Sequence, residues 1–269
     1  MRLEIALAIA AIWAAGVSPP ARAQTGAPRN NGASNKVPDL MGTWGHDERQ
    51  GFLEGIQPSI SISDPLGAKR GKEDDIPYQP WALDKTMKEV SSFDQFGQGG
   101  TDPWSKYCEP AGLLRVYVAP ARTKFVQTPD AVYILHEFGQ AFRIVRLNSK
   151  HPDDPDPTWW GDSIGSYENG DTLVVDTIGV NDKTWLDEFG RPHTEQMHLI
   201  ERYRRADAET LELDATIDDP GAYTKPFKAH RTFRLSSLPF MQTPWVCSVR
   251  ENQKFYNESA EPATAPAKK

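Results

Sequence analysis

Cysteine is scarce in this chain, which has only Cys108 and Cys247 among its 269 residues. So few cysteines leave no Cys-rich spacing for a metal site. Neither cysteine lies in a recognisable nucleophile motif, so we do not expect a catalytic thiol. In an oxidising compartment an even pair predicts a disulfide, with two buried free thiols as the alternative.

Positive charge and long apolar runs are also limited. Lys and Arg number 30 against 37 Asp and Glu, which gives a formal net charge of −7. An acidic chain without a basic stripe is a poor partner for nucleic acid or anionic membrane surfaces. Beyond the N-terminus, no apolar run approaches the ~20 residues of a membrane span. We therefore expect a small-molecule partner, no nucleic acid and no membrane insertion, and the oligomeric state stays open.

Motifs for cofactors and metals are missing as well. The chain has no GxSxG elbow, no P-loop and no dinucleotide fingerprint. It has no HxH or HExxH spacing, and His193 and His198 are five residues apart. The Asp-rich segment 151–157 lacks the ligand spacing of an EF-hand. We expect no metal and no cofactor, which leaves cofactor-free acid–base chemistry or simple binding.

The N-terminus carries the pattern of an export signal. It reads MRLEIALAIAAIWAAGVSPPARAQ, with Arg2, an apolar stretch and a small-residue cleavage site before Gln24. This pattern predicts a secretory signal peptide, a buried N-terminal helix being the alternative, and hence a periplasmic or secreted protein. The expected organisation is a signal peptide at 1–23, a disordered leader at 24–37, a single barrel domain at 38–256 and a disordered tail at 257–269.

Short, evenly spaced strands dominate the chain from Ala131 onward. Runs such as AVYILHEF, AFRIVRL, DTLVVDTIGV and ETLELDATID alternate with tight turns and no helices. This pattern predicts an antiparallel meander, and closing it into an up-and-down barrel removes its exposed edges. The Pro/Gly-rich region from Leu40 to about Pro129 is expected to be an irregular segment with one short helix, in PWALDKTMKEVSSF.

A glycine–tryptophan motif supports the barrel. Gly42 and Trp44, in the run GTW, stand at the start of the ordered region. Gly-x-Trp on a first strand, with an arginine of a late strand over the indole, is the pattern of lipocalin-like barrels, which this chain resembles. Arg202, Arg204 and Arg234 are the candidates for that arginine, and a tryptophan that merely packs beside a glycine is the alternative. The predicted fold is mainly β, an antiparallel lipocalin-like barrel.

Asp176 interrupts the apolar strand GDTLVVDTIGV. Side chains alternate between the two faces of a strand, so Asp176 shares a face with Val174 and Ile178. If that face is the lumen, the carboxylate either pairs with Arg202 or His198 or serves as an acid or base. If the face is exterior, the carboxylate is solvated and inert. We expect a paired structural carboxylate first, a catalytic one second and a bystander third.

The candidate catalytic residues lie in the connection NDKTWLDEFGRPH and the following strand, TEQMHLIERYRR. On that strand His198 and Arg202 share one face and Glu201 points to the other, so either face carries ionisable groups that a ligand cavity would use. In the catalytic interpretation, His193 or His198 transfers a proton. Asp176 or Glu201 sets the pKa of that histidine, and Arg202 binds a substrate carboxylate or stabilises a developing oxyanion. The alternative is that these charges only pair with one another.

Aromatic side chains near these residues are candidates for a ligand pocket. Trp160, Tyr167 and Trp185 would hold a small aromatic compound, with Tyr133 and His136 as further candidates. His136 lies on an apolar face, where a satisfied core histidine is the more common outcome. Residues 151–157, which come just before Trp160 in the chain, are expected to form a surface turn.

Two functions remain open from the residues alone. One is a cofactor-independent lyase, decarboxylase or isomerase that acts on a small phenolic compound by acid–base chemistry in the barrel cavity. The other is a non-catalytic periplasmic binding or carrier protein for a small hydrophobic ligand. The two share a cavity and differ in whether its polar groups are fully paired with one another.

Several strings also carry a family resemblance. GDSIGSYENGDTLVVDTIGVNDKTWLDEFGRPHTEQMHLIERYRR, DDPGAYTKPF and a late W-x-C are similar to those of a broad family of exported bacterial proteins, many of them hypothetical. The resemblance covers most of the mature chain. It implies export and transfers no catalytic residue.

Overall fold

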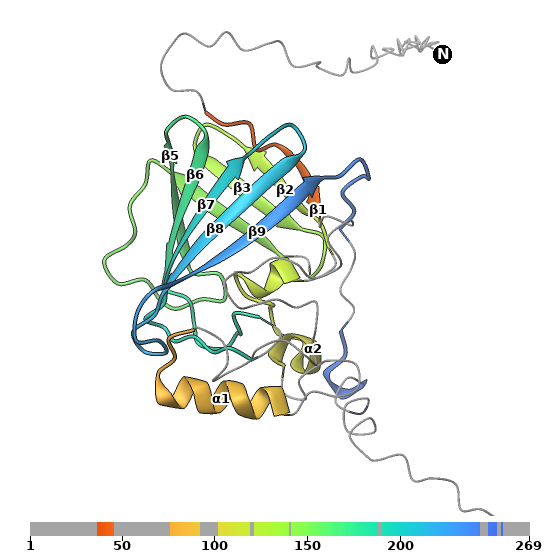
Figure 1. Ribbon diagram of the computed structural model, residues 1–269. Coiled ribbons are helices and arrows are strands. Elements are labelled where there is room, and N and C mark those ends of the chain that lie inside the picture. The colour runs from red at the N-terminus through yellow and green to blue at the C-terminus, as the bar shows by residue number, and fades with distance from the viewer. Residues whose placement is uncertain are drawn as a thin grey trace, which may run out of the picture. The chain divides into compact units, whose positions relative to one another are not determined.

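Figure 1 shows the protein as a computed structural model. The structure describes residues 37–45, 76–91, 102–118, 121–139, 141–187, 190–242, 247–251 and 254. The predicted signal peptide 1–23, the leader up to residue 36 and the tail 257–269 lie outside the described residues.

The described strands close into one barrel of nine strands, in which each strand pairs with its neighbour in sequence and β9 returns to β1 (Figure 1). This closure confirms the predicted mainly β barrel and removes the sheet edges. The strands are β1 (Gly42–Gly45), β2 (Thr123–Gln127), β3 (Ala131–His136), β4 (Phe142–Leu147), β5 (Asp162–Glu168), β6 (Thr172–Ile178), β7 (His198–Arg205), β8 (Thr210–Asp218) and β9 (Phe227–Leu235).

One junction corrects the predicted all-antiparallel order. β4 and β5 run parallel, with Arg146 opposite Ile164 and Leu147 opposite Gly165. A parallel pair needs a connection that returns the chain to the other end of the sheet. Residues 148–161, called the crossover below, make that connection along the outside of the barrel (Figure 1).

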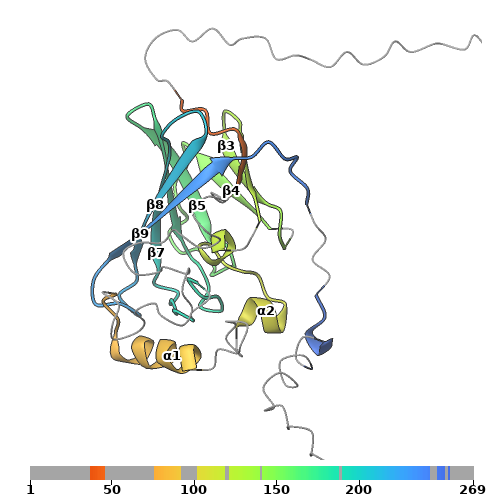
Figure 2. The same cartoon turned by 45° about the vertical axis from the view of Figure 1, so that its right-hand side comes forward.

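The segment before β3 is more ordered than the sequence predicted. The helix α1 (Pro80–Ser91) confirms the expected helix, and the structure adds a short α2 (Pro103–Tyr107), a 3₁₀ turn (Arg115–Val118) and β2. α1, α2 and the 3₁₀ turn all lie at one end of the barrel, called the helix end below, as Figures 1 and 2 show. β7 begins at His198 rather than Thr194, because the Thr194 backbone N–H donates to the Asp219 carboxylate (2.6 Å) in a turn.

Alternation along the strands decides which side chains fill the lumen. On β6, Leu173, Val175 and Thr177 are fully buried inside the barrel, so Asp176 between them faces outward. Tyr117 of the 3₁₀ turn enters the lumen from the helix end and contacts Phe233. The inward residues form most of one continuous apolar core, which includes Trp44, Phe125, Ile134, Val145, Leu199, Leu213, Ile217 and Phe233.

The glycine–tryptophan motif is present with a different arginine from those predicted. The buried Trp44 indole donates to the Leu40 carbonyl (2.9 Å), and the Arg205 guanidinium lies 5.2 Å from its ring centroid. Arg202 and Arg204 point outward from β7, whereas Arg205 ends the strand on the lumen side. The Arg205–Trp44 contact is a cation–π interaction, consistent with a lipocalin-like barrel.

Cys108 and Cys247 form the predicted disulfide, 139 residues apart in sequence, with their Cα atoms 5.7 Å apart. The bond ties the end of α2 to the segment that follows β9. None of the described helices has the length and apolar character needed to cross a membrane.

Candidate functional site

The five predicted catalytic residues lie in three separate places. Glu201 points into the lumen. Asp176, His198 and Arg202 lie on the outer face of β6 and β7. His193 is buried in the connection between β6 and β7. The fold therefore brings Asp176 and His198 into contact outside the barrel, on a face that they share with Arg202.

Inside the barrel, Glu201 is the centre of a buried polar network. Its carboxylate lies 2.6 Å from the Arg143 guanidinium, and these side chains are 0% and 2% exposed. Arg143 also donates to the hydroxyls of Ser163 (2.9 Å) and Thr177. Tyr203 donates its hydroxyl to Glu201 (2.7 Å). Burial costs each charge its hydration, and this mutual pairing offsets that cost.

The charge states of this network follow from burial and pairing. Burial raises the pKa of the Tyr117 hydroxyl, which lies 2.7 Å from that of Tyr203, and the nearby Glu201 adds to the shift. Burial alone would lower the pKa of the Arg143 guanidinium, because it disfavours the charged form. The attraction of the nearby Glu201 carboxylate outweighs this effect and raises that pKa. The cavity beside Tyr117 and Arg231 is only about 10 Å³, no more than the space of one water. The polar network is therefore buried within the apolar core of the lumen.

His136 belongs to the same core. Its Nδ1 lies 3.1 Å from the Thr123 hydroxyl, and its ring stacks on Trp160 with centroids 6.2 Å apart. Burial, together with the positive charge of Arg143, lowers its pKa to about 3. His136 is thus a neutral, hydrogen-bonded core histidine at neutral pH, as its apolar face indicated.

A cavity of about 360 Å³ opens at the helix end of the barrel, outside the packed lumen. This volume lies in the usual range of small-molecule pockets. We call it the mouth pocket. Its described lining residues are Trp104, Cys108, Glu109, Pro110, Ala111, Val116, Phe138, Gly139, Ala141, Phe142 and Trp160.

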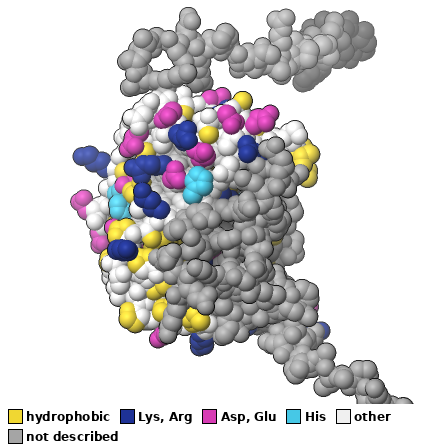
Figure 3. All heavy atoms as spheres, in the orientation of Figure 1, with side chains coloured by type: hydrophobic (Ala, Val, Ile, Leu, Met, Phe, Trp, Pro, Cys, Tyr) yellow, Lys and Arg dark blue, Asp and Glu magenta, His cyan; other side chains and the backbone are white. Residues whose placement is uncertain are grey.

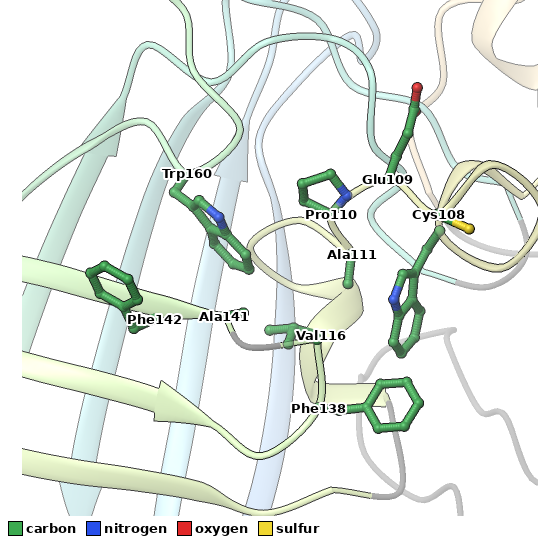
Figure 4. Close-up of a pocket in the computed structure, with 11 residues that line it drawn as sticks. Cys108, Glu109, Pro110, Ala111, Val116, Phe138, Ala141, Phe142 and Trp160 are labelled. Carbon is green, nitrogen blue, oxygen red and sulfur yellow. The ribbon is translucent and has the colours of Figure 1, made fainter. Parts of the chain in front are cut away.

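Figure 4 shows how the side chains of the mouth pocket are arranged. Trp160 and Phe138 stand on opposite sides, with the small side chains of Ala111 and Val116 between them. Glu109 is the one ionisable side chain among the described lining residues, and its carboxyl group points away from the rings. The pocket therefore presents aromatic walls and a narrow apolar floor.

Contacts outside the pocket hold its aromatic wall in place. Asp102 caps α2 by accepting from the Trp104 backbone N–H (3.1 Å) and also accepts from Arg115 (3.0 Å). The Arg115 guanidinium lies 5.0 Å from the Trp104 ring centroid. The rings of Trp104 and Phe138 pack edge to face, with their centroids 5.3 Å apart. This chain of contacts preorganises the wall, which lowers the cost of binding a ligand.

Of the predicted ligand-binding aromatics, only Trp160 lines the mouth pocket. Tyr167 points inward and accepts from Gln127 (2.9 Å), and burial raises the pKa of its hydroxyl. Tyr133 lies on the outer face of β3. Trp185 is buried in the connection between β6 and β7. These positions place three of the predicted binding residues away from the pocket.

The connection between β6 and β7 is a packed structural segment at the helix end (Figure 1). His193 contacts the Thr184 hydroxyl (2.7 Å), and burial lowers its pKa, partly offset by the Thr194 carbonyl and Asp219. Arg191 and Asp187 form a buried ion pair in the same segment. His193 thus faces protein groups and lines neither the mouth pocket nor the lumen network.

Asp176 lies on the outer face and is 35% exposed, but it is paired with histidines rather than left without a partner, which corrects one of the sequence-based alternatives. Its carboxylate lies 2.7 Å from His198 and 3.2 Å from His151. His151 was expected in a surface turn, but its side chain is only 17% exposed because it lies between Asp176 and Asp162. Arg202 lies 3.9 Å from Glu168 rather than against Asp176.

Several site residues were not identified from the sequence. Trp104, Phe138 and Phe142 line the mouth pocket, and Arg143 neutralises Glu201. The aromatic-rich run DPWSKYC beside Cys108 was the available signal, because the predicted disulfide ties that run to the barrel. Among the described residues, no group of three or more His, Cys, Asp or Glu side chains is arranged to hold a metal ion.

No family model matches this chain, and no curated protein matches it either. The resemblance to exported bacterial proteins stays a prediction.

Proposed function

We propose that this protein binds a small, planar aromatic compound in the mouth pocket and serves as a binding or carrier protein. The observation that carries this proposal is a cavity of about 360 Å³ walled by Trp104, Phe138, Phe142 and Trp160. Aromatic rings favour offset-stacked or edge-to-face contacts with another ring. A compound of one or two aromatic rings with small substituents fits within this volume.

The chemistry of the pocket walls further restricts the class of ligand that we propose. Glu109 points away from the rings, so the described walls offer no charged partner to a ligand (Figure 4). A neutral phenol fits this setting better than a multiply charged compound, because a buried charge without a partner is costly. The ligand class we propose is therefore neutral, planar and aromatic.

A cofactor-independent lyase, decarboxylase or isomerase is the alternative function for the same pocket. None of the five predicted catalytic residues lines it. In the lumen behind it, Glu201 pairs with Arg143 and accepts from Tyr203, so these charges already have protein partners. Binding without chemistry is therefore the better supported function.

We also propose that the protein is exported to the periplasm or secreted. The Cys108–Cys247 disulfide supports this proposal, because disulfides persist in oxidising compartments. N-terminal sequencing of the protein expressed with its full sequence tests it. A mature N-terminus at Gln24 is expected, and retention of Met1 in a cytoplasmic fraction would contradict export.

The binding proposal is tested by a thermal-shift screen against phenols and aromatic acids, with mass spectrometry of each mixture. A ligand at 100 times its Kd should add about 2.7 kcal/mol to the free energy of unfolding. Trp160→Ala should remove the shift, whereas Tyr133→Ala, which changes an aromatic residue on the outside of the barrel, should keep it. A shift that survives Trp160→Ala contradicts the mouth pocket, and formation of a product favours the lyase.

A further inference from the structure

Four apolar side chains lie together on the outer face of β3 and β4. Phe142 and Ile144 alternate with buried residues along β4, and they are 56% and 45% exposed. In the antiparallel β3–β4 ladder, Leu135 lies opposite Phe142 and Tyr133 lies opposite Ile144. Residues directly opposite each other on one face have their Cβ atoms about 5 Å apart. The four side chains therefore form one continuous surface, which we call the apolar strip.

The apolar strip contrasts with the outer face of other strands. Figure 3 shows acidic, basic and histidine side chains intermixed over the strands that face the viewer. On β7, for example, the outward positions include His198, Arg202 and Arg204. A group of exposed apolar side chains is a typical mark of a ligand-binding groove or an interaction site. The strip is therefore a candidate for contact with an apolar group.

Phe142 connects the apolar strip to the mouth pocket. It lines the pocket, and it is also the most exposed residue of the strip. Figure 4 shows it on the Trp160 side of the pocket, away from Phe138. A ligand bound against these rings therefore has an apolar surface directly beside it, outside the pocket.

The strand pairing explains why the pocket opens onto the strip. β4 and β5 pair through Arg146 and Leu147, so the beginning of β4, from Phe142 to Val145, has no described strand beside it on that side. The crossover ends just before β5, and its Trp160 lines the pocket together with Phe142. The parallel junction therefore leaves the start of β4 accessible from the pocket.

Charged pairs limit the strip at both ends. Along β4 the next outward residue is Arg146, which donates to both carboxylate oxygens of Asp162 (2.7 Å each). At the end of β3, Glu137 accepts from the Arg122 guanidinium (2.8 Å). These groups are paired with one another, so an apolar chain gains nothing by extending past them. The strip therefore accommodates an apolar chain of limited length.

We propose that the ligand of the mouth pocket is an aromatic ring that carries an aliphatic chain, with the ring in the pocket and the chain on the apolar strip. This inference rests on the proposed function, since the ring must first occupy the pocket. The ligand class is a neutral amphiphile, such as a phenol with an alkyl chain para to the hydroxyl. Removal of apolar surface from water on both partners holds the chain on the strip.

The dimensions of the strip set the length of that chain. Phe142 and Ile144 are two residues apart on one strand, which is about 7 Å. A fully extended chain advances about 1.2 Å per bond, so about six carbon atoms reach from the edge of the pocket to Ile144. A longer chain meets Arg146 and its ion pair with Asp162. The affinity should therefore rise with chain length and then level off.

A protein partner fits the strip less well than an aliphatic chain. Each partner of a standard protein interface buries about 800 Å². Four side chains bounded by charged pairs provide much less, and two of them, Tyr133 and Leu135, are already partly buried. The strip thus has the area of an alkyl chain rather than that of a protein interface.

The test measures Kd, by quenching of tryptophan fluorescence, for phenol and its 4-propyl, 4-pentyl, 4-heptyl and 4-nonyl derivatives, each below its solubility limit. A fully buried CH₂ is worth about fourfold in affinity. Because the strip covers one side of the chain, we expect about twofold per CH₂ up to about six carbons and little gain beyond. 1-Heptanol, which has a chain without a ring, should bind much more weakly than 4-heptylphenol.

Variants of the strip test where the chain lies. Ile144→Thr removes apolar surface and keeps a β-branched residue in the strand. It should weaken binding of 4-pentylphenol about fivefold, the worth of about two of these CH₂ contacts, and leave binding of phenol unchanged. Tyr133→Ala, on the neighbouring strand, should show the same selective loss. Met87→Ser is the matched control, because Met87 is 40% exposed on α1 and is not among the lining residues of the pocket.

The outcomes separate this proposal from the proposed function, and a thermal melt of each variant shows whether the fold is kept. If phenol does not bind, or binds Trp160→Ala equally well, the mouth pocket and the strip both fail. If phenol binds through Trp160 but Kd does not change with chain length, or Ile144→Thr acts no differently from Met87→Ser, only the strip fails. Sedimentation tests another occupant: a dimer that Ile144→Thr disrupts would make the strip an interface between copies and overturn the proposal.

Discussion

Arg143 and Glu201 illustrate how much a single buried contact determines in this protein. Both side chains are almost completely removed from water, and they lie 2.6 Å apart. Each of these charges would be strongly destabilising without the other. Their pairing explains why ionisable residues occur on inward positions of β4 and β7 without any ligand.

The first prediction concerns this pair. Glu201→Ala should lower the free energy of unfolding by about 3–5 kcal/mol, because it leaves the Arg143 charge buried without its partner. Urea denaturation followed by tryptophan fluorescence measures the change. Glu168→Ala, which removes an exposed carboxylate, should change it by less than about 1 kcal/mol. Similar losses for the two variants would contradict a buried pair.

The second prediction concerns His136 and pH. Because burial lowers its pKa to about 3 in the folded state, the unfolded chain binds a proton between about pH 6.5 and 3 while the folded chain does not. Stability is therefore lost as the pH falls through this window, by about 2 kcal/mol between pH 7 and 5. His136→Gln removes the titrating group, so the variant should not lose this stability. The difference in the free energy of unfolding between wild type and variant should therefore shrink by about 2 kcal/mol from pH 7 to pH 5. Parallel pH profiles would contradict the prediction.

At the scale of elements, the crossover is the most informative segment. It makes β4 and β5 parallel, and it brings His151 against Asp162 and Asp176. Its backbone is also tied to the end of β6: the Thr158 N–H donates to the Gly179 carbonyl (2.9 Å), and the Asn181 N–H donates to the Thr158 carbonyl (2.8 Å). The crossover is thus held to the barrel by side chains and backbone together.

The third prediction tests this attachment. His151→Ala removes contacts to two carboxylates, so the crossover should open more often and the Thr158 amide should exchange with solvent at least about tenfold faster. Hydrogen exchange followed by NMR or mass spectrometry measures this rate. Asp153→Ala, an exposed change within the same segment, should leave the exchange rate unchanged. Unchanged exchange in His151→Ala would show that the backbone bonds alone hold the crossover.

At the scale of the whole molecule, the helix end of the barrel is covered by segments that are distant in sequence. Tyr117 enters the lumen from the 3₁₀ turn, and the disulfide ties Cys108, which lines the mouth pocket, to Cys247. The covalent bond therefore restrains one wall of the proposed binding pocket. Stability and ligand affinity should depend on it together.

The fourth prediction follows from this link. Replacing both Cys108 and Cys247 with Ser should lower the free energy of unfolding by about 3–5 kcal/mol, since the closed loop is long. Urea denaturation measures this loss, and the wild type with reductant should approach the variant. Aromatic ligands found in the thermal-shift screen should also bind the variant more weakly. A variant as stable as the wild type would show that noncovalent packing alone holds the helix end closed.

Particular elements show what could be predicted from the sequence and what could not. The alternation in DTLVVDTIGV and ETLELDATID predicted β6 and β8, because a half-buried strand needs apolar residues at every second position. The parallel β4–β5 junction could not be predicted, since periodicity along a strand carries no information about its direction. The five-residue β2 was missed in a Pro-rich region whose strand pattern is too short to detect.

The fold class, the helix α1 and the two cysteines of the disulfide could be predicted from the chain alone, because local periodicity and residue counts are properties of the chain. Which face of each strand is the lumen depends on how the barrel closes. β7 carries ionisable groups on both faces, so its pattern is ambiguous until the barrel closes. Closure places Glu201 beside Arg143 and Asp176 beside His198, because residues far apart in sequence meet only through strand register.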